Sequence, residues 1–154
     1  MIDIQLLLQH LHGMTVQHPI QSAILYHFIF LGLILFCVPG VIVFSAAAGV
    51  LFGIEKGSAL VLFSFTLGTS LLFLIVRSLL NNYLHKKWVD KLALLNRLIK
   101  ENGFWGLVSF RLIGLPHFVV TLLMALSDIS GQQFLLSTLI STIPTHVVAV
   151  FMGA

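Results

Sequence analysis

The chain has 154 residues, of which 58% are hydrophobic and only 8% are charged, and its formal net charge is +3. A water-soluble domain of this length needs far more charged side chains to cover its surface, so the composition excludes a soluble protein and predicts an all-α, polytopic membrane protein. The single cysteine, Cys37, allows no internal disulfide.

Residues 1–17 predict a short amphipathic helix that lies in the membrane interface. Apolar side chains recur at helical spacing from Ile4 to Met14, while Asp3 and His10 lie off this stripe. No Lys or Arg occurs in the first 19 residues, so the segment does not match the basic start of a cleavable secretory leader.

Two uncharged runs, residues 20–38 and 57–76, predict helices that cross the membrane. Each approaches the roughly 20 residues that are needed to span a hydrocarbon core about 30 Å thick. Arg77 ends the second run, and its long side chain can reach toward the lipid headgroups. We therefore interpret Arg77 as an anchor at the membrane surface.

Between these runs, residues 39–53 predict a re-entrant hairpin. Pro39 and Gly40 break the preceding helix, and Gly49 and Gly53 loosen the short apolar segment that follows. Apolar segments of 10 to 14 residues are more often re-entrant than spanning, and a broken backbone survives at membrane depth only beside protein or water.

The loop after Arg77 predicts a basic amphipathic helix over about residues 82–101. Five of the eight basic residues lie here, and apolar residues alternate with them at helical spacing. The basic residues are Lys86, Lys87, Lys91, Arg97 and Lys100. An excess of Lys and Arg in a short loop marks the cytoplasmic side. The basic loop is therefore predicted to be cytoplasmic, with three full crossings in the whole chain.

The second half of the chain repeats the pattern of the first. A short apolar piece follows Pro116, a polar break contains Asp128, and a last apolar run is interrupted by Pro144. We expect a second re-entrant hairpin over about residues 104–127. Glu55 lies in the corresponding break of the first half, which makes Glu55 and Asp128 candidates for coupling to protons or cations. Broken segments at matching places predict a transporter built from two repeats, with its site near the membrane midplane.

Several short motifs in this order resemble the VTT domain of the DedA superfamily, also called SNARE-associated Golgi protein-like. They are "AAGVLFG" (47–53), Gly57, Gly68, Phe73, Arg77, Gly103, "RLIGLP" (111–116), Pro144 and "MGA" (152–154). The resemblance covers about residues 18–154, which we expect to form one domain. It implies two hairpins that face each other from opposite sides of the membrane. It also implies a flippase or scramblase of phospholipids or polyprenyl phosphates.

The sequence departs from the bacterial DedA branch at two places. That branch has an acidic residue after the Pro-Gly pair, where this chain has Val41 and so lacks the carboxylate that would couple transport to protons. It also has a second arginine six residues after the first, where this chain has His117 after Arg111. The chain is closer to the Golgi-protein-like branch, and a minimal or degenerate member stays open.

Arg111 has two interpretations. An arginine at the bilayer centre costs at least ~2.5 to 3.5 kcal/mol, so it should face a cavity or a partner. It either caps carbonyl groups freed near Gly114, or it binds an anionic lipid headgroup with its bidentate fork. In the second interpretation Arg77 gathers lipid at the cytoplasmic mouth. For His117 two roles stay open: a structural hydrogen bond, which the sequence slightly favours, and assistance to Arg111 in headgroup binding. For His146, two residues after Pro144, we expect a hydrogen bond to a freed carbonyl.

Other functions are less well supported by the sequence. No metal-ligand motif and no cofactor motif occurs, and a Ser70–His146 pair lacks the glycine that a serine nucleophile needs beside it. We therefore predict no enzyme, metal or cofactor. The expected partners are lipids with anionic phosphate headgroups and no nucleic acid, a homo-oligomer stays open, and the expected location is the bacterial cytoplasmic membrane. The alternatives are a non-transporting assembly or trafficking factor and an ion-coupled transporter of small solutes.

Overall fold

The computed structural model describes residues 9, 13–38, 40–80, 89–113 and 115–154. Every regular element in these residues is a helix: α2 (Pro19–Leu35), α3 (Val41–Ile75), the π-helix η1 (Val76–Leu80), α5 (Val89–Leu112), α6 (His117–Leu126) and α7 (Gly131–Gly153). The predicted all-α class is confirmed. Two helical stretches, Val41–Leu79 and Gly131–Gly153, are long and apolar enough to cross a membrane, and α2 and α6 are shorter apolar helices.

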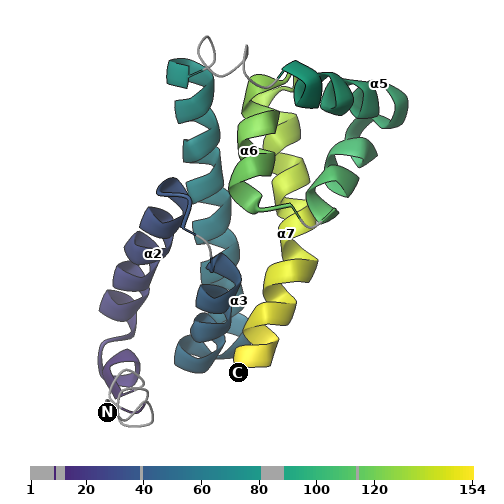
Figure 1. Ribbon diagram of the computed structural model, residues 1–154. Coiled ribbons are helices and arrows are strands. Elements are labelled where there is room, and N and C mark those ends of the chain that lie inside the picture. Colours follow the sequence, from purple (N-terminus) through teal and green to yellow (C-terminus); the bar gives the residue numbers. More distant parts are fainter. Residues whose placement is uncertain (1–8, 10–12, 39, 81–88, 114) are drawn as a thin grey trace.

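The first half of the chain reverses direction twice. α2 runs to the middle of the molecule, and residues 41–52 of α3 run back beside it (Figure 1). The second reversal is at Gly53, whose φ of 77° and ψ of 177° are open to glycine and strained for other residues. The rest of α3 and η1 then run along the whole molecule. As a result, a Cβ atom at Gly57 would lie only 2.7 Å from the carbonyl oxygen of Ala48.

α2 ends in a local hydrogen-bonded cap. The Cys37 N–H donates to the Ile34 carbonyl at 3.1 Å, and the Val38 N–H donates to the Leu33 carbonyl at 2.9 Å. Cys37 takes a left-handed φ of 55°, so the two bonds form a Schellman motif that stops the helix. α2 has 17 residues, at the short end of the range for a membrane-spanning helix, and it forms one arm of a helical hairpin, so the full crossing over residues 20–38 stays a prediction.

The boundaries predicted for the first hairpin, residues 39–53, are corrected. Within that range the described residues form one helical arm, so the tip of the hairpin lies at the start of the range and not in its middle. Pro39 lies outside the described residues. We call α2 together with residues 41–52 the first hairpin. Its two arms pair because Tyr26, Phe30 and Ile34 of α2 are buried in one cluster with Val41 and Ala48.

The second half has the same parts in the opposite direction. α5 bends at Gly103, with φ 56° and ψ −137°, and residues 104–112 then lead to the middle of the molecule. α6 returns from there, and α7 runs beside α3 (Figure 1). We call residues 104–112 together with α6 the second hairpin, which lies within the range predicted from the sequence. A capping box between Ser130 and Gln133 starts α7.

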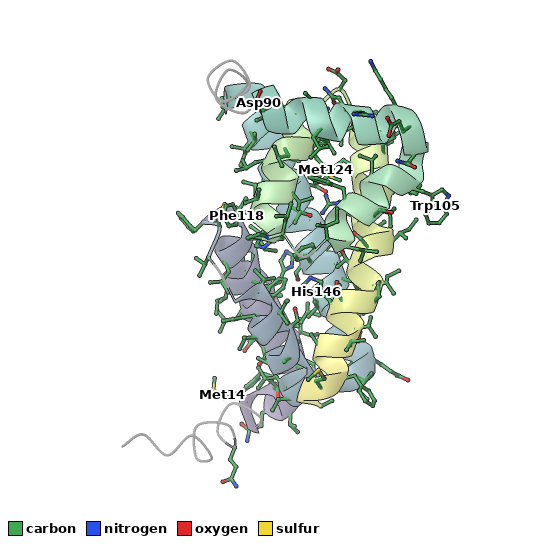
Figure 2. The ribbon with its side chains drawn as sticks, turned by 45° about the vertical axis from the view of Figure 1, so that its right-hand side comes forward. Met14, Asp90, Trp105, Phe118, Met124 and His146 are labelled. Atoms are coloured by element: carbon green, nitrogen blue, oxygen red, sulfur yellow. The ribbon has the colours of Figure 1, made fainter. Side chains whose placement is uncertain are left out.

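The two hairpins therefore point toward each other from opposite ends of the molecule (Figure 1). In Figure 2 Met14 and Asp90 mark the two ends, and His146 lies between them. One buried cluster holds each hairpin against α3, and α7 contributes Val150 to the first cluster and Phe134 to the second. That the hairpins enter a membrane from its two sides stays a prediction.

The outer surface of the bundle is apolar. Large hydrophobic side chains are exposed on the sides of several helices, including Ile20 at 74%, Phe63 at 61% and Phe151 at 66%. Water-soluble proteins bury most of their large apolar side chains, whereas a membrane protein can expose them to lipid tails. The surface therefore agrees with the membrane location that the composition predicted.

The two predicted interfacial helices lie partly outside the described residues. Of the N-terminal one, residues 9 and 13–17 are described, and all of them are helical. Of the basic loop helix, Lys86 and Lys87 lie outside, and the described part belongs to α5. There Leu92 is buried while Arg97 is exposed, as the amphipathic pattern predicted.

Candidate functional site

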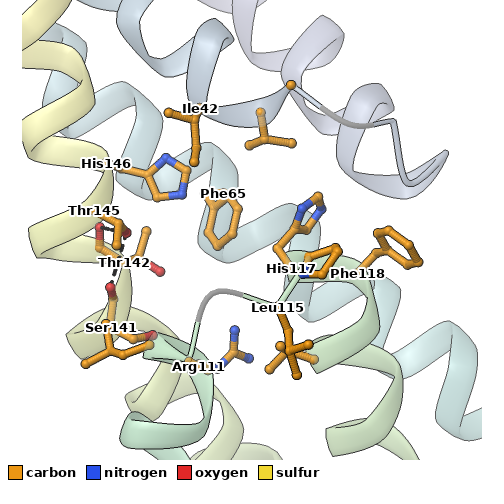
Figure 3. Close-up of a pocket in the computed structure, with 15 residues that line it drawn as sticks. Ile42, Phe65, Arg111, Leu115, His117, Phe118, Ser141, Thr142, Thr145 and His146 are labelled. Atoms are coloured by element: carbon orange, nitrogen blue, oxygen red, sulfur yellow. Dashed lines mark hydrogen bonds between the residues drawn. The ribbon is translucent and has the colours of Figure 1, made fainter.

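A cavity of about 480 Å³ lies where the tips of the two hairpins meet. Its walls come from the start of α3, the end of α5, the start of α6 and the middle of α7, and Phe65 of α3 lies at its centre (Figure 3). The lining residues that matter for the site are Gly40, Phe65, Arg111, Pro116, His117, Thr145 and His146. Because these residues are far apart in the sequence, the cavity exists only in the folded chain.

Two helices begin at this cavity. α3 starts after Gly40, which takes a φ of 111°, and α6 starts after Pro116; neither start has a side-chain cap. The first N–H groups of a helix have no partner within it, and they carry the positive end of the helix dipole. Two uncapped helix starts at one place favour the binding of an anion.

Arg111 adds a full positive charge at the same place. Its guanidinium extends into the space between the two hairpin tips (Figure 3). The Nε and Nη2 atoms are buried, and neither has a hydrogen-bond partner among the described residues. The salt bridge found in the described part of the chain joins Arg97 to Glu101 at the surface, so it does not neutralise Arg111. A buried cation with unused donors is costly, and a bound anion removes that cost.

The alternative interpretation of Arg111, as a cap for carbonyl groups, finds no support in the described residues. No described carbonyl accepts a hydrogen bond from its Nε or Nη2 atom. Gly114, whose surroundings were expected to supply those carbonyls, lies outside the described residues. The guanidinium rests instead on the ring of Phe134, with its Cζ atom 4.7 Å from the ring centroid.

Two histidines lie on either side of Phe65 (Figure 3). The His117 ring centroid is 5.7 Å from that of Phe65, and its buried Nε2 atom has no partner among the described residues. The His146 ring centroid is 4.4 Å from that of Phe65, and the Nδ1 atom of His146 lies 2.7 Å from the Ser45 hydroxyl oxygen. The Ser45 hydroxyl also lies 2.9 Å from the Val41 carbonyl, and the tautomer of His146 decides which of the two partners receives its one proton.

The middle of α7 lines the cavity with hydroxyl groups around Pro144. Proline has no N–H, so the carbonyl of Ile140 loses its usual partner in the helix. Ser141, Thr142 and Thr145 all donate their hydroxyl protons to carbonyls four residues earlier. These hydroxyls therefore present oxygen lone pairs to the cavity rather than protons.

Arg77 is not part of this cavity. Its Nε, Nη1 and Nη2 atoms donate to the carbonyls of Ala125, Ile129 and Ser127 at 3.1, 2.7 and 2.5 Å. These carbonyls lie at the end of α6 and in the turn that follows it, and they bind all three guanidinium nitrogens of Arg77. The predicted substrate-binding role of Arg77 therefore has no geometric support. Arg77 and Arg111 thus have different surroundings. The backbone satisfies the guanidinium of Arg77, whereas two nitrogens of Arg111 have no hydrogen-bond partner in the described chain.

Glu55 and Asp128 are both exposed. Glu55 follows the reversal at Gly53, and Asp128 lies in the turn between α6 and α7. Neither lines the cavity, and their coupling role stays a prediction. Within the described residues, no group of three potential ligands could hold a metal ion.

The sequence missed several side chains of the site. Ser45, Phe65 and Phe134 lie within apolar runs, and no motif marks them. His146 was noted, but its partner is a hydroxyl and not the predicted carbonyl. Ser70 donates to the Thr66 carbonyl at 2.6 Å and does not pair with His146. Only a histidine beside a proline in an apolar helix gave a signal.

Comparisons with known proteins agree with this architecture. Residues 38–154 match the family described as the VTT domain. The chain is 31% identical over 122 residues to a transmembrane protein 41 homolog of Dictyostelium discoideum, covering 77% of this chain and 36% of that protein. It is 25% identical over 155 residues to an uncharacterized membrane protein of Arabidopsis thaliana, covering 98% of this chain and 54% of that protein.

The chain thus spans about a third and about half of the length of these two curated relatives. No solved structure matches it. The matched residues include the tips of both hairpins, Arg111 and the hydroxyl-lined part of α7. Because residues 38–154 match the VTT domain, and because two helices are long and apolar enough to cross a membrane, the chain belongs to the VTT-domain family and is an integral membrane protein.

Proposed function

We propose that the protein moves phospholipids or polyprenyl phosphates across the membrane, as a flippase or scramblase, without changing them chemically. The observation that carries this proposal is Arg111, whose buried N–H groups are unused at the meeting point of two helix starts. A phosphate group matches this arrangement, because a guanidinium binds two of its oxygens and helix N–H groups bind the others.

The position of the cavity fits the hardest step in lipid movement. A headgroup that crosses a bilayer meets its highest barrier in the hydrocarbon core, where no water solvates its charge. We propose that the two hairpins enter from opposite sides and hold the site near mid-depth. The broken backbone at their tips is then buried by protein or lines the cavity, which is the condition for such backbone at membrane depth.

The remaining wall of the cavity suits the apolar part of a lipid. Ile42, Leu112, Leu115 and Phe118 line it next to the polar groups. A headgroup on Arg111 therefore has an apolar neighbourhood for its first acyl carbons. Location in a bacterial cytoplasmic membrane stays a prediction, and the two relatives above are from eukaryotes.

The test is reconstitution of the purified protein into phosphatidylcholine vesicles that carry a fluorescent phospholipid or a labelled polyprenyl phosphate. The fraction of label that reaches the outer leaflet with time measures lipid movement. A parallel sample measures uptake of radioactive inorganic phosphate, which distinguishes a lipid headgroup from a free anion. Phosphate uptake without lipid movement would identify a solute transporter. The absence of both activities would refute the transport proposal and favour the assembly factor.

Variants of Arg111 test the site itself. Arg111→Lys keeps the charge and loses the bidentate fork, so lipid movement should fall about tenfold or more, since hydrogen bonds to charged groups contribute about 1.5 to 3 kcal/mol. Arg111→Gln should fall further. Arg97→Gln, which removes an exposed arginine, is the matched control and should leave the rate unchanged. A well-folded Arg111→Gln protein with the wild-type rate would refute the headgroup site.

A further inference from the structure

Phe134 connects Arg111 to a larger stack of side chains. The rings of Phe73 and Phe134 are stacked, with centroids 4.1 Å apart and planes at 27°. The Cζ atom of Arg77 lies 4.7 Å from the Phe73 centroid, and that of Arg111 lies 4.7 Å from the Phe134 centroid. Since each ring gives one face to the other ring, the two guanidinium groups cover the outer faces. We call this arrangement, Arg111–Phe134–Phe73–Arg77, the four-layer stack.

The two ends of the four-layer stack differ. Arg77 is fixed by three backbone carbonyls, whereas two nitrogens of Arg111 have no partner in the described chain. Between them Phe73 and Phe134 are 2% and 1% exposed, so packing leaves their rings little freedom. The stack is therefore anchored at one end and open toward the cavity at the other.

The backbone at Arg77 and at Phe134 has special features as well. Arg77 lies on the π-helix η1, a kind of helix that is rare and often found at functional sites. The carbonyl of Phe134 accepts hydrogen bonds from the Ser137 hydroxyl at 3.0 Å and the Thr138 hydroxyl at 2.6 Å. These bonds fix the start of α7 at the place from which the Phe134 ring projects.

We propose that Phe134 is the positioning residue of the anion site, and that Phe73 and Arg77 hold its ring in place. A guanidinium that lies flat on a ring keeps its N–H edge free and turned to the side, which is the edge that binds phosphate. The ring thus removes rotational freedom from Arg111 before the ligand arrives, and this pre-organisation raises affinity. The inference rests on the proposed function, because its ligand is a lipid phosphate.

The test replaces Phe134 by phenylalanines with one, two and three ring fluorines, introduced by suppression of a stop codon. Fluorine keeps the ring's shape and withdraws the negative charge from its face, so it weakens the cation–π contact. The readout is the Kd of dihexanoyl phosphatidic acid for the purified protein in a non-ionic detergent. The Kd should rise with each fluorine, by about three- to thirtyfold in total, while far-ultraviolet circular dichroism shows that the helical fold is kept.

The same series at Phe110 is the matched control. Phe110 is 6% exposed and belongs to the same buried cluster, and no guanidinium lies over its ring in the described part of the chain. Its fluorination should leave the Kd unchanged. A flat Kd series at Phe134, or an equal rise at Phe110, would overturn the positioning role while wild-type binding still supports the headgroup site. If the wild-type protein does not bind the probe, both proposals fail.

Discussion

Replacing Gly49 with alanine should push the first hairpin away from α7. An added Cβ atom would lie 2.0 Å from the carbonyl oxygen of Val150 and 2.9 Å from the amide nitrogen of Ala154. Real contacts to a Cβ atom do not come closer than 3.0 Å, so the helices must separate locally by about 1 Å. Both obstacles are backbone atoms, and no change of rotamer relieves the clash.

The expected loss of stability follows from this separation. Overpacking typically costs about 1 to 3 kcal/mol, and a gap of 0.5 to 1 Å forfeits about a quarter to a half of the dispersion energy of the contacts around it. α3 has its most extensive contact with α7, so we expect Gly49→Ala to lower the free energy of unfolding by about 3 kcal/mol. Lipid movement should also fall, because residues 41–52 position one of the two helix starts at the cavity.

The assay is equilibrium unfolding in mixed micelles with increasing dodecyl sulfate, followed by far-ultraviolet circular dichroism. Gly32→Ala in α2 is the matched control, since no atom lies within 4 Å of a Cβ atom there. Alanine is the better helix former by up to about 1 kcal/mol, so this control should be as stable as the wild type or slightly more stable. Equal stability of Gly49→Ala and Gly32→Ala would refute the close approach of the two helices.

Three further predictions concern Arg77 and the topology. Arg77→Met should lower the free energy of unfolding by about 3 kcal/mol in the same assay, because three backbone carbonyls lose a charged donor; a loss below about 1 kcal/mol would show that they find other partners. In a Cys37→Ser background, single cysteines at Lys56 and Asp90 should react with an impermeant thiol reagent from opposite sides of the membrane, and reaction from one side contradicts this topology. A cysteine at Gln21 should react from the same side as the one at Lys56, because the first hairpin returns to the end at which it starts; opposite sides would make α2 a full crossing.

Local signals in the sequence predicted the lipid environment of the chain, its helices and the places where these helices break. The low charge content requires lipid around the chain, and glycine and proline act on the backbone where they stand. For the same reason Arg111 could be identified as a residue that needs a partner, since a charge in an apolar run is costly in any fold. The second hairpin lies within its predicted range because its breaks, at Gly103 and Pro116, are visible in the sequence.

The tertiary structure alone decided how the helices pair and which arginine is left open. The length of α2 suggested a crossing helix, but its end is set by the cap at Cys37 and by packing against residues 41–52. Arg77 and Arg111 both stand in apolar surroundings in the sequence, yet Arg77 finds carbonyls about 50 residues away and Arg111 finds a ring and a cavity. Hydrogen-bond partners at such separations are determined by how helices pack, and no local pattern of residues contains that information.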